Sequence, residues 1–323
     1  MPLFGHRRPT ATPPPTTPPG PGPRPPGRDV EDQEALARGD LPVSVQERLA
    51  RERDRGLPWT STLTVSDWAV GHALGVVPLG QVMGSSLYHT GWTYMPSWQS
   101  GELQAPTQAA YNVRTLALER MRQEAALLGA SGVIAVRIQR NAYEWGEHMT
   151  EFTAAGTAVR VTGAALPKRP FLATVDGTDL LRLVRAGHVP LGVALGLSVA
   201  YVYTDWGSQM QEMGWTNQEM ASFTQATYDI RRLAMDRLER EARAIGADGV
   251  IAYDTSMEVT AIERSGGGMA GGMGGMGGGQ GDHTDHIIEY AAIGTAIGRM
   301  ASASAATTTA PVLSLRDPVQ EGS

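Results

Sequence analysis

Three methionines and two histidines in the last third of the chain carry the side chains that a soft metal ion selects. Met269, Met273 and Met276 lie in a glycine-rich segment, and His283 and His286 follow it. Thioether sulfur and imidazole nitrogen suit Cu(I) or Ag(I), and a glycine backbone could fold around such an ion. The same segment also fits a flexible linker with incidental methionines. The only cofactor that the sequence suggests is therefore a soft metal ion (Cu or Ag), and the linker remains the alternative.

The acidic and histidine residues beside this segment do not complete a chelate by themselves. Glu147 and His148 align with Asp285 and His286 when the chain is compared with itself, but no methionine-rich segment accompanies the first pair. Residues three apart on a strand, such as His286 and Glu289, point to opposite faces of the sheet. Ligands from a neighbouring subunit would therefore be needed.

Large apolar side chains gather in two other segments. Trp92 and Trp98 lie in the first, and Trp206 and Trp215 lie in the second, each with methionines nearby. Because Trp and Met are enriched where proteins contact each other, we predict that these tryptophans lie at a subunit interface. The alternative is an apolar pocket for a small ligand.

Residue types that support catalysis are scarce. The 323 residues include no cysteine, which excludes thiolate nucleophiles, disulfides, cysteine-ligated zinc and iron–sulfur clusters. Lys168 is the single lysine, and no Gly-x-Ser-x-Gly motif occurs. Arg114 and Arg231 recur at one aligned position, as do Arg120 and Arg237, and we expect them to form ion pairs with a neighbour. The alternative is an anion site across an interface. We predict that the protein is not an enzyme.

Charge and hydropathy limit the possible partners and the location. The net charge of −6 argues against a general nucleic-acid binder. The longest apolar run, 189–203, is shorter than the ~20 residues that cross a bilayer. We therefore expect a cytoplasmic protein without a membrane or nucleic-acid partner. The proline-rich N-terminal tail could still bind a protein partner.

An internal repeat is the strongest pattern in the sequence. Four segments recur, with offsets that grow from 112 to 117 and then to 138 residues. The offset grows only in the connecting segments, as is expected when two copies of one module accept different insertions. The matching pairs are 77–84 with 189–196, 111–121 with 228–238, 129–135 with 246–252, and 151–159 with 289–297.

Each copy has the pattern of a β-α-β-β module. In 189–203, large residues alternate with small ones such as Gly192, Ala194 and Gly196, which is typical of a strand. We expect the large face to bury against a helix and the small face to admit another layer closely. Gly129 and Gly246 lie at the predicted helix ends, where a C-cap residue with left-handed backbone conformation is expected. The predicted buried helix stripes are Tyr111, Leu118, Met121, Ala125 and Leu128, and Tyr228, Met235, Leu238, Ala242 and Ile245.

The size of the module predicts assembly. Three strands and one helix leave a small core and two bare sheet edges. Pairing with further copies removes both problems, and closed symmetry is the usual result. We therefore expect a homo-oligomeric ring.

The sequence divides into six segments. These are a disordered proline-rich tail (1–40), a charged surface helix (41–60), the first copy (61–163), a linker (164–173), the second copy (174–300) with its Gly/Met-rich loop at 265–281, and a disordered tail (301–323).

The two copies resemble the YbjQ-like family. The resemblance rests on the Leu-Gly-Ala-x-x-Val motif at the end of the first helix, in 117–135, which is Ile-Gly-Ala-x-x-Val in the second copy, in 234–252. It rests also on Gly-Thr-Ala at 156–158 and 294–296. It covers roughly 78–162 and 190–300 and implies α+β, two-layer, dodecin-like units that assemble as pentameric rings. A ring of ten units, or two stacked rings, would accommodate fused copies. The family has a heavy-metal-binding label, but the resemblance implies no activity. The polar Arg-Asp…Gly-Gly stretch of single-copy members is replaced here by the Trp/Met segments.

Overall fold

The computed structural model describes residues 27–53, 60–89, 100–142, 149–204, 220–264 and 283–300. The chain divides into two compact regions, residues 1–48 and 49–323. The first region holds α1 (Arg28–Ala37) and the start of α2 (Val43–Arg53). Within it, the Arg28 guanidinium pairs with Glu47 at 2.8 Å, and the Ser44 hydroxyl donates to Asp32 at 2.9 Å. No helix was expected within 1–40, where α1 lies.

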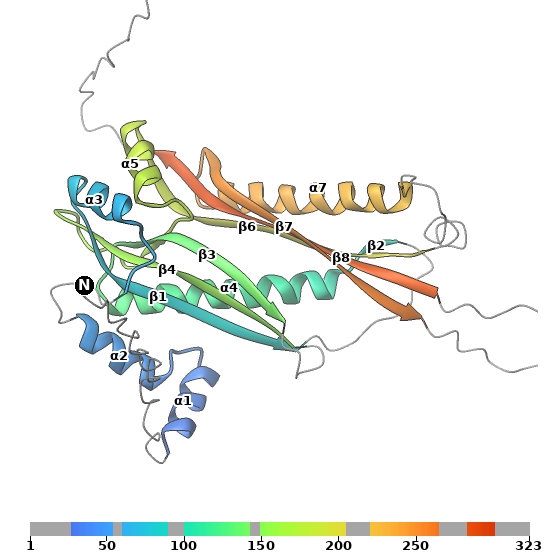
Figure 1. Cartoon of the computed structure of the whole chain (residues 1–323), viewed down its shortest axis with the longest axis horizontal. Coiled ribbons are helices and arrows are strands. Elements are labelled where there is room, and N and C mark those ends of the chain that lie inside the picture. The colour runs from blue at the N-terminus through green and yellow to red at the C-terminus, as the bar shows by residue number, and fades with distance from the viewer. Residues whose placement is uncertain are drawn as a thin grey trace, which may run out of the picture. The chain divides into compact units, whose positions relative to one another are not determined.

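The second region contains both copies, and each has the predicted order of elements (Figure 1). The first copy consists of α3 (Val65–Ala73), β1 (Val76–His89), β2 (Gly101–Glu102), α4 (Gln104–Leu127), β3 (Gly132–Ala142) and β4 (Met149–Val161). The linker forms β5 (Phe171–Leu172). The second copy consists of α5 (Gly177–Arg185), β6 (His188–Val202), α7 (Ala221–Ala244), β7 (Gly249–Arg264) and β8 (His283–Arg299). The prediction of two tandem β-α-β-β modules is thus confirmed.

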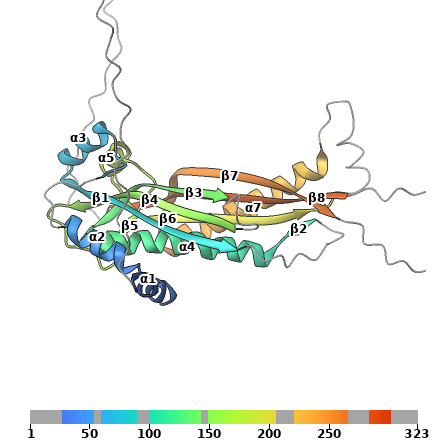
Figure 2. The ribbon, with the colours of Figure 1, turned by 60° about the horizontal axis from the view of Figure 1, so that its bottom comes forward.

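Local signals explain where the helices begin and end. Thr64 and Asp67 form a capping box at the start of α3, and the Asp176 side chain caps α5. Gly129 and Gly246 follow α4 and α7 with φ of 70° and 77°, the left-handed conformation that glycine adopts at helix ends. In Figures 1 and 2, α3 and α5 lie beside each other, while α4 and α7 run along the long strands.

Each copy forms an antiparallel sheet, and each sheet includes one short strand from outside its own copy. The strand orders are β1-β4-β3-β5 and β2-β6-β8-β7. β2 belongs to the first copy but pairs with β6, whereas β5 precedes the second copy and pairs in parallel with β3. These two crossings join the copies through backbone hydrogen bonds.

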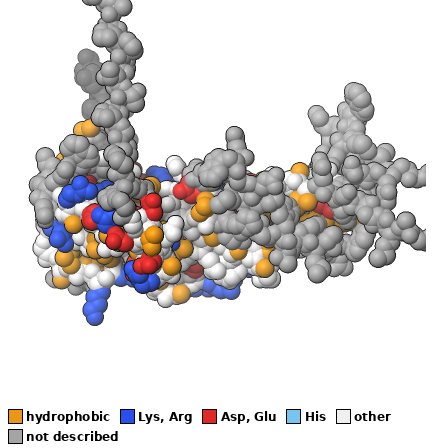
Figure 3. All heavy atoms as spheres, turned by 90° about the horizontal axis from the view of Figure 1, so that it is seen from below, with side chains coloured by type: hydrophobic (Ala, Val, Ile, Leu, Met, Phe, Trp, Pro, Cys, Tyr) orange, Lys and Arg blue, Asp and Glu red, His pale blue; other side chains and the backbone are white. Residues whose placement is uncertain are grey.

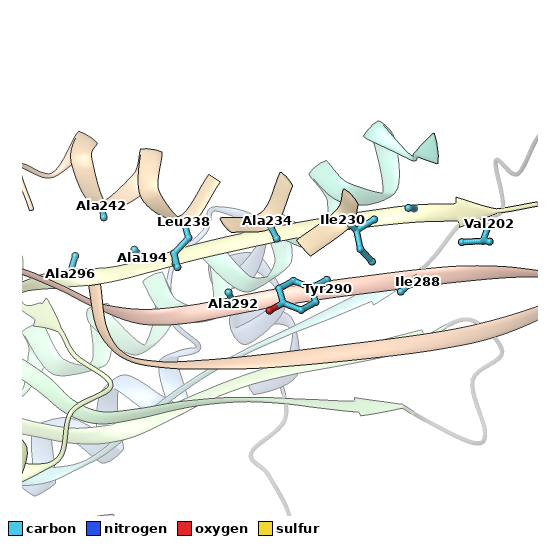
Figure 4. Close-up of a cluster of buried hydrophobic side chains, with 11 residues drawn as sticks. Ala194, Val202, Ile230, Ala234, Leu238, Ala242, Ile288, Tyr290, Ala292 and Ala296 are labelled. Atoms are coloured by element: carbon cyan, nitrogen blue, oxygen red, sulfur yellow. The ribbon is translucent and has the colours of Figure 1, made fainter. Parts of the chain in front are cut away.

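The two faces of β6 pack against different helices. A Cβ on Gly196 would lie 2.1 Å from the Ala234 carbonyl oxygen, so the small face fits against α7 of its own copy. Figure 4 shows Ala194 and Ala292 on the strands below Ala234 and Leu238 of α7. The large residues bury against a helix as expected, but that helix is α4 of the first copy.

The predicted helix stripe holds for α4 and only partly for α7. Leu118, Met121 and Ala125 are buried in α4, and Leu238 and Ala242 are buried in α7. Tyr228 and Ile245 are instead 64% and 46% exposed, so their predicted burial is wrong for the single chain. Tyr228 is exposed because, among the described residues, no second sheet lies against the outer side of α7, whereas β6 lies against α4 at Tyr111.

The surface carries charges of both signs. Acidic and basic side chains are interspersed on the described part of the face shown in Figure 3. Among the described residues, no helix combines the length and apolar character that a membrane span requires.

Candidate functional site: the interface between the two copies

Most of the side chains proposed from sequence as ligands or interface residues lie outside the described residues. These are Met269, Met273, Met276, Trp92, Trp98, Trp206 and Trp215. His283 begins β8, but its side chain is also outside the described set. Only the His286 side chain can be placed.

His286 lies on β8 against the start of α7. Its ring meets Phe223 edge-on, with centroids 4.7 Å apart and an interplanar angle of 76°, and its buried Nδ1 has no hydrogen-bond partner in the described structure. The neighbouring Asp285 accepts hydrogen bonds from the Tyr201 hydroxyl and from the Thr204 amide at 3.0 Å. Among the described residues, no cluster of three or more His, Cys, Asp or Glu could hold a metal ion.

The contacts between the copies are more extensive, and Tyr111 of α4 is central to them. Its hydroxyl donates to the Leu195 carbonyl at 2.8 Å and accepts from the Leu197 amide at 3.1 Å. Burial raises the pKa of Tyr111 to about 12, and the nearby Glu241 carboxylate acts in the same direction. The hydroxyl therefore remains protonated and satisfies two groups on the outer edge of β6.

An ion pair joins the same helix to the second sheet. Arg114 is 4% exposed and pairs with Glu289 of β8. Its guanidinium also lies over the Phe152 ring of its own copy, 4.2 Å from the centroid. The sequence-based expectation of ion pairing is thus met by Arg114, and the partner belongs to the other copy.

A second ion pair joins the helix of the second copy to a carboxylate of the first copy. Arg237 of α7 binds both carboxylate oxygens of Glu102, which follows Gly101 in β2. Ser198 also donates to Glu102, at 2.8 Å. Burial opposes ionisation of Glu102, but these hydrogen bonds outweigh burial and hold the pKa of Glu102 below its usual value.

The short helices add a further polar contact. Asp67 of α3 accepts from the Thr178 amide and hydroxyl of α5, both at 3.0 Å. Burial would raise the pKa of Asp67, but hydrogen bonds from Thr64 and Thr178 lower it below its usual value. The Asp67 carboxylate therefore links the starts of the two helices.

A backbone connection follows the linker. We call residues 61–63 the first arm and 173–175 the second arm. The second arm pairs with β3 through the Ala135 amide and the Val175 carbonyl at 2.8 Å, and through the Val136 amide and the Ala173 carbonyl at 3.0 Å. Its Thr174 amide donates to Thr295 at 2.7 Å. The second arm is therefore bonded to both copies.

A groove of about 360 Å³ lies between β3, the second arm and β7. Its polar lining includes Arg137, Asp176, Asp179 and Asp254. Because the groove is bounded by strands of both copies, it is a described position at the interface where a small polar ligand could fit.

Sequence reasoning missed several of the residues that join the copies. Tyr111 was expected in a buried stripe, but its hydrogen bonds to β6 were not foreseen. Glu102, Asp67 and Thr174 carried no sequence signal beyond their types. A Tyr-x-x-Arg pattern does recur at 111–114 and 228–231, and it could have indicated a shared contact.

Comparisons with known proteins agree with this arrangement. The sequence profile of the family described as "Putative heavy-metal-binding" matches residues 57–162. The chain is 38% identical over 201 residues to "Encapsulin nanocompartment protein Rv1762c" from Mycobacterium tuberculosis, covering 60% of this chain and 76% of that protein. A UPF0145 protein from Thermotoga maritima is 34% identical over 102 residues, covering 32% of this chain and 94% of that protein.

The length of these matches fits the duplication. The T. maritima protein corresponds to about one copy, whereas the alignment with the M. tuberculosis protein is too long for a single copy. Together with the repeated fold, these matches show that the chain belongs to the YbjQ-like family, as a tandem pair of that family's β-α-β-β modules.

Proposed function

We propose that this protein is a non-enzymatic cytoplasmic protein that assembles with itself into a ring and offers ligand sites at its interfaces. The observation that carries the proposal is an asymmetry between the copies. Arg114 is 4% exposed and Leu197 is fully buried where the two copies meet. The aligned Arg231 and Ser85 contact no other copy in the described structure, and Arg231 is exposed. Surfaces built for a partner thus remain uncovered in one chain.

The relatives give independent support. The M. tuberculosis relative is named an encapsulin nanocompartment protein, which favours a role within a larger assembly for this chain too. The cytoplasmic location rests on the sequence alone. The proposal of a non-enzymatic role rests on the sequence, in which cysteine and the Gly-x-Ser-x-Gly motif do not occur.

The mass of the intact protein tests self-assembly. We expect native mass spectrometry of the full chain at micromolar concentration to give one closed multiple of the chain mass. Static light scattering over a tenfold dilution should agree. A single-chain mass at every concentration would contradict the proposal.

The groove between β3 and β7 is the site that we propose for a ligand. A guanidinium and three carboxylates line it, so a small zwitterionic or cationic molecule suits its chemistry better than an apolar one. Asp176→Asn and Asp254→Asn should weaken any such binding without changing the assembly mass. Binding that is equal in wild type and in both variants would exclude the groove.

Soft-metal binding is the second candidate function. The family description names heavy metals, and His286, the one proposed ligand whose side chain is described, has a buried Nδ1 without a hydrogen-bond partner there. Met269, Met273, Met276 and His283 would supply the remaining soft ligands, and Cu(I) or Ag(I) would be the metal.

Deleting 266–281 tests this second function directly. We expect Cu(I) affinity, measured by competition with a chromogenic chelator, to fall at least tenfold in the deletion. The matched control keeps the segment length and replaces Met269, Met273 and Met276 with leucine. Unchanged affinity in both variants, or no binding by wild type, would reject the metal function and leave self-assembly untouched.

A further inference from the structure

We propose that a second copy of this chain docks head-to-tail, with α7 of one chain lying on the β1 side of the next, as α4 lies on β6 within the chain. This inference rests on the proposed self-assembly and specifies its partner, its direction and its residues. It predicts that the contact inside the chain and the contact between chains are equivalent, so that first and second copies alternate around the assembly.

The donor face is the outer side of α7, defined here by Tyr228 and Arg231. These residues align with Tyr111 and Arg114, the two residues of α4 that reach the second copy. Tyr228 is 64% exposed, and Arg231 is exposed as well. The donor face therefore carries the same two residue types that α4 uses to bind the second copy, but in the described structure they are exposed.

The acceptor face is the outer side of β1, defined here by Met83 and Leu87. Their aligned residues on β6, Leu195 and Val199, are 4% and 5% exposed beneath α4. Met83 and Leu87 are 48% and 52% exposed. Two large apolar side chains on one strand are thus uncovered only in the first copy, at the positions that α4 covers in the second. The acidic partner that aligns with Glu289 is Glu151 on β4.

The outer edges of β1 and β6 can receive two kinds of hydrogen bond. One kind comes from the helix of the same copy, and the other comes from the other copy. Glu124 accepts from the Met83 amide at 2.9 Å, as Glu241 does from Leu195 at 2.7 Å. Arg120 donates to the Ser85 carbonyl at 2.6 Å, as Arg237 does to Leu197 at 2.9 Å. These bonds within each copy recur at both edges.

The bonds that the other copy supplies do not recur. On β6 the Tyr111 hydroxyl donates to the Leu195 carbonyl and accepts from the Leu197 amide, and the Thr107 hydroxyl accepts from the Val199 amide at 3.0 Å. No described residue makes the corresponding bonds to β1. The Nε of Arg120 is also buried without a hydrogen-bond partner in the described structure, whereas Arg237 has Glu102. The edge of β1 therefore receives the same hydrogen bonds from its own copy as the edge of β6 does. In the described structure it lacks the hydrogen bonds that another copy would supply.

The opposite side of the interface shows the same asymmetry. Val136 on β3 is 1% exposed and its amide pairs with the second arm, whereas the aligned Tyr253 on β7 is 55% exposed. The first arm is held in its own copy as the second arm is, through Thr62 to Thr157 at 2.9 Å and Thr174 to Thr295 at 2.7 Å. The first arm of one chain can thus add to β7 of the preceding chain.

The short helices extend the pattern. Asp67 binds the start of α5, whereas the aligned Asp179 binds Arg182 on its own helix. The residue that begins α3, Val65, is 88% exposed, while Gly177 at the aligned position is buried against Asp67. The start of α3 is therefore a further surface that a preceding chain can cover.

A contact of this kind is heterologous, because the donor and acceptor faces are different surfaces of one chain. Repetition of a heterologous contact closes into a ring or continues as a filament. It also allows each face to be blocked separately. Tyr228→Asp/Arg231→Glu blocks only the donor face, and Met83→Asp/Leu87→Asp blocks only the acceptor face.

The experiment mixes the two blocked variants. We expect each variant alone to have a single-chain mass by native mass spectrometry, and an equimolar mixture to form a dimer and nothing larger. In that dimer the intact donor face of one variant meets the intact acceptor face of the other. Arg232→Glu and Leu166→Asp are the matched controls, because both residues are exposed and lie outside the two faces, and both controls should assemble like wild type.

The outcomes separate this inference from the proposed function. A wild-type protein with a single-chain mass would contradict self-assembly itself. A wild-type assembly that persists in both blocked variants, or blocked variants that do not form a dimer when mixed, would overturn head-to-tail docking and leave self-assembly standing. Circular dichroism must show wild-type secondary structure in each variant, which the exposure of all four residues leads us to expect.

Discussion

At the scale of single residues, two kinds of position hold the copies in shape. Small residues on β1 and β6 allow a helix backbone to approach closely, and charged residues at the interface find partners of opposite sign. Gly84 and Gly196 illustrate the first kind, since a Cβ on either would lie 2.1 Å from a carbonyl oxygen of the facing helix. Glu102 with Arg237 illustrates the second.

Gly196→Ala should destabilise the protein strongly. The added methyl group would meet backbone atoms of α7, which cannot move independently of the helix, so we expect a loss of about 2–3 kcal/mol in the free energy of unfolding. Gly192→Ala is the matched control, because its Cβ would meet only the Ile245 Cδ1 at 3.3 Å. Urea titration followed by circular dichroism measures both. Equal losses would mean that the close helix–strand approach is not the cause.

Glu102→Gln should change stability in a pH-dependent way. Because the pKa of Glu102 is lower in the folded chain than the ordinary 4.5, its ionised form stabilises the fold at pH above that value. This contribution disappears as the pH falls through the lowered pKa. We expect the variant to lose about 2 kcal/mol at pH 7 and progressively less as the pH falls below 4.5.

Chemical unfolding at pH 7 and in a series of acidic buffers tests this sign. Glu239→Gln serves as the control, since its pair with Arg243 is an exposed contact within one helix and should contribute under ~0.5 kcal/mol. A loss in Glu102→Gln that grows as the pH falls would contradict the assignment.

At the scale of elements, the same helix has two different surroundings. α4 lies against β1 of its own copy and also against β6 of the other copy, whereas α7 packs in the described structure against the sheet of its own copy. The sequence predicted both helices, both glycine ends and the strands, because apolar periodicity and capping are local properties. It did not predict that β2 and β5 exchange sheets, since strands of two residues carry no periodicity.

Tyr111→Phe and Tyr228→Phe should differ, although the residues occupy one aligned position. Loss of the Tyr111 hydroxyl removes a donor and an acceptor that serve the edge of β6, so we expect a loss of about 1–2 kcal/mol. Tyr228→Phe should change the stability by less than ~0.5 kcal/mol. Both are to be compared by urea unfolding in the Met83→Asp/Leu87→Asp background, where contacts between chains are blocked. The reverse order would show that α4 does not stabilise the second sheet in this way.

At the scale of the whole molecule, assembly should be linked to stability. If chains associate through folded surfaces, mass action makes the unfolding midpoint rise with chain concentration. We expect the thermal midpoint of wild type to increase over roughly two decades of chain concentration, from about 1 to about 100 µM, and that of Tyr228→Asp/Arg231→Glu to stay constant. Differential scanning calorimetry measures both. A constant midpoint in wild type would mean that assembly, if present, does not involve the folded faces described above.

The sequence alone determined the duplication, the β-α-β-β order and the family, because these are written in repeated residues and in periods of two and 3.6. Its soft-metal and tryptophan sites remain predictions, since all but His286 lie beyond the described side chains. Only the tertiary structure decided which face of β6 meets which helix, and that Arg114 and Tyr111 serve the other copy. The physical reason is that identical local patterns acquire different burial from long-range neighbours. Tyr111 and Tyr228 occupy one aligned position, yet among the described residues Tyr111 contacts the sheet of the other copy and Tyr228 is 64% exposed.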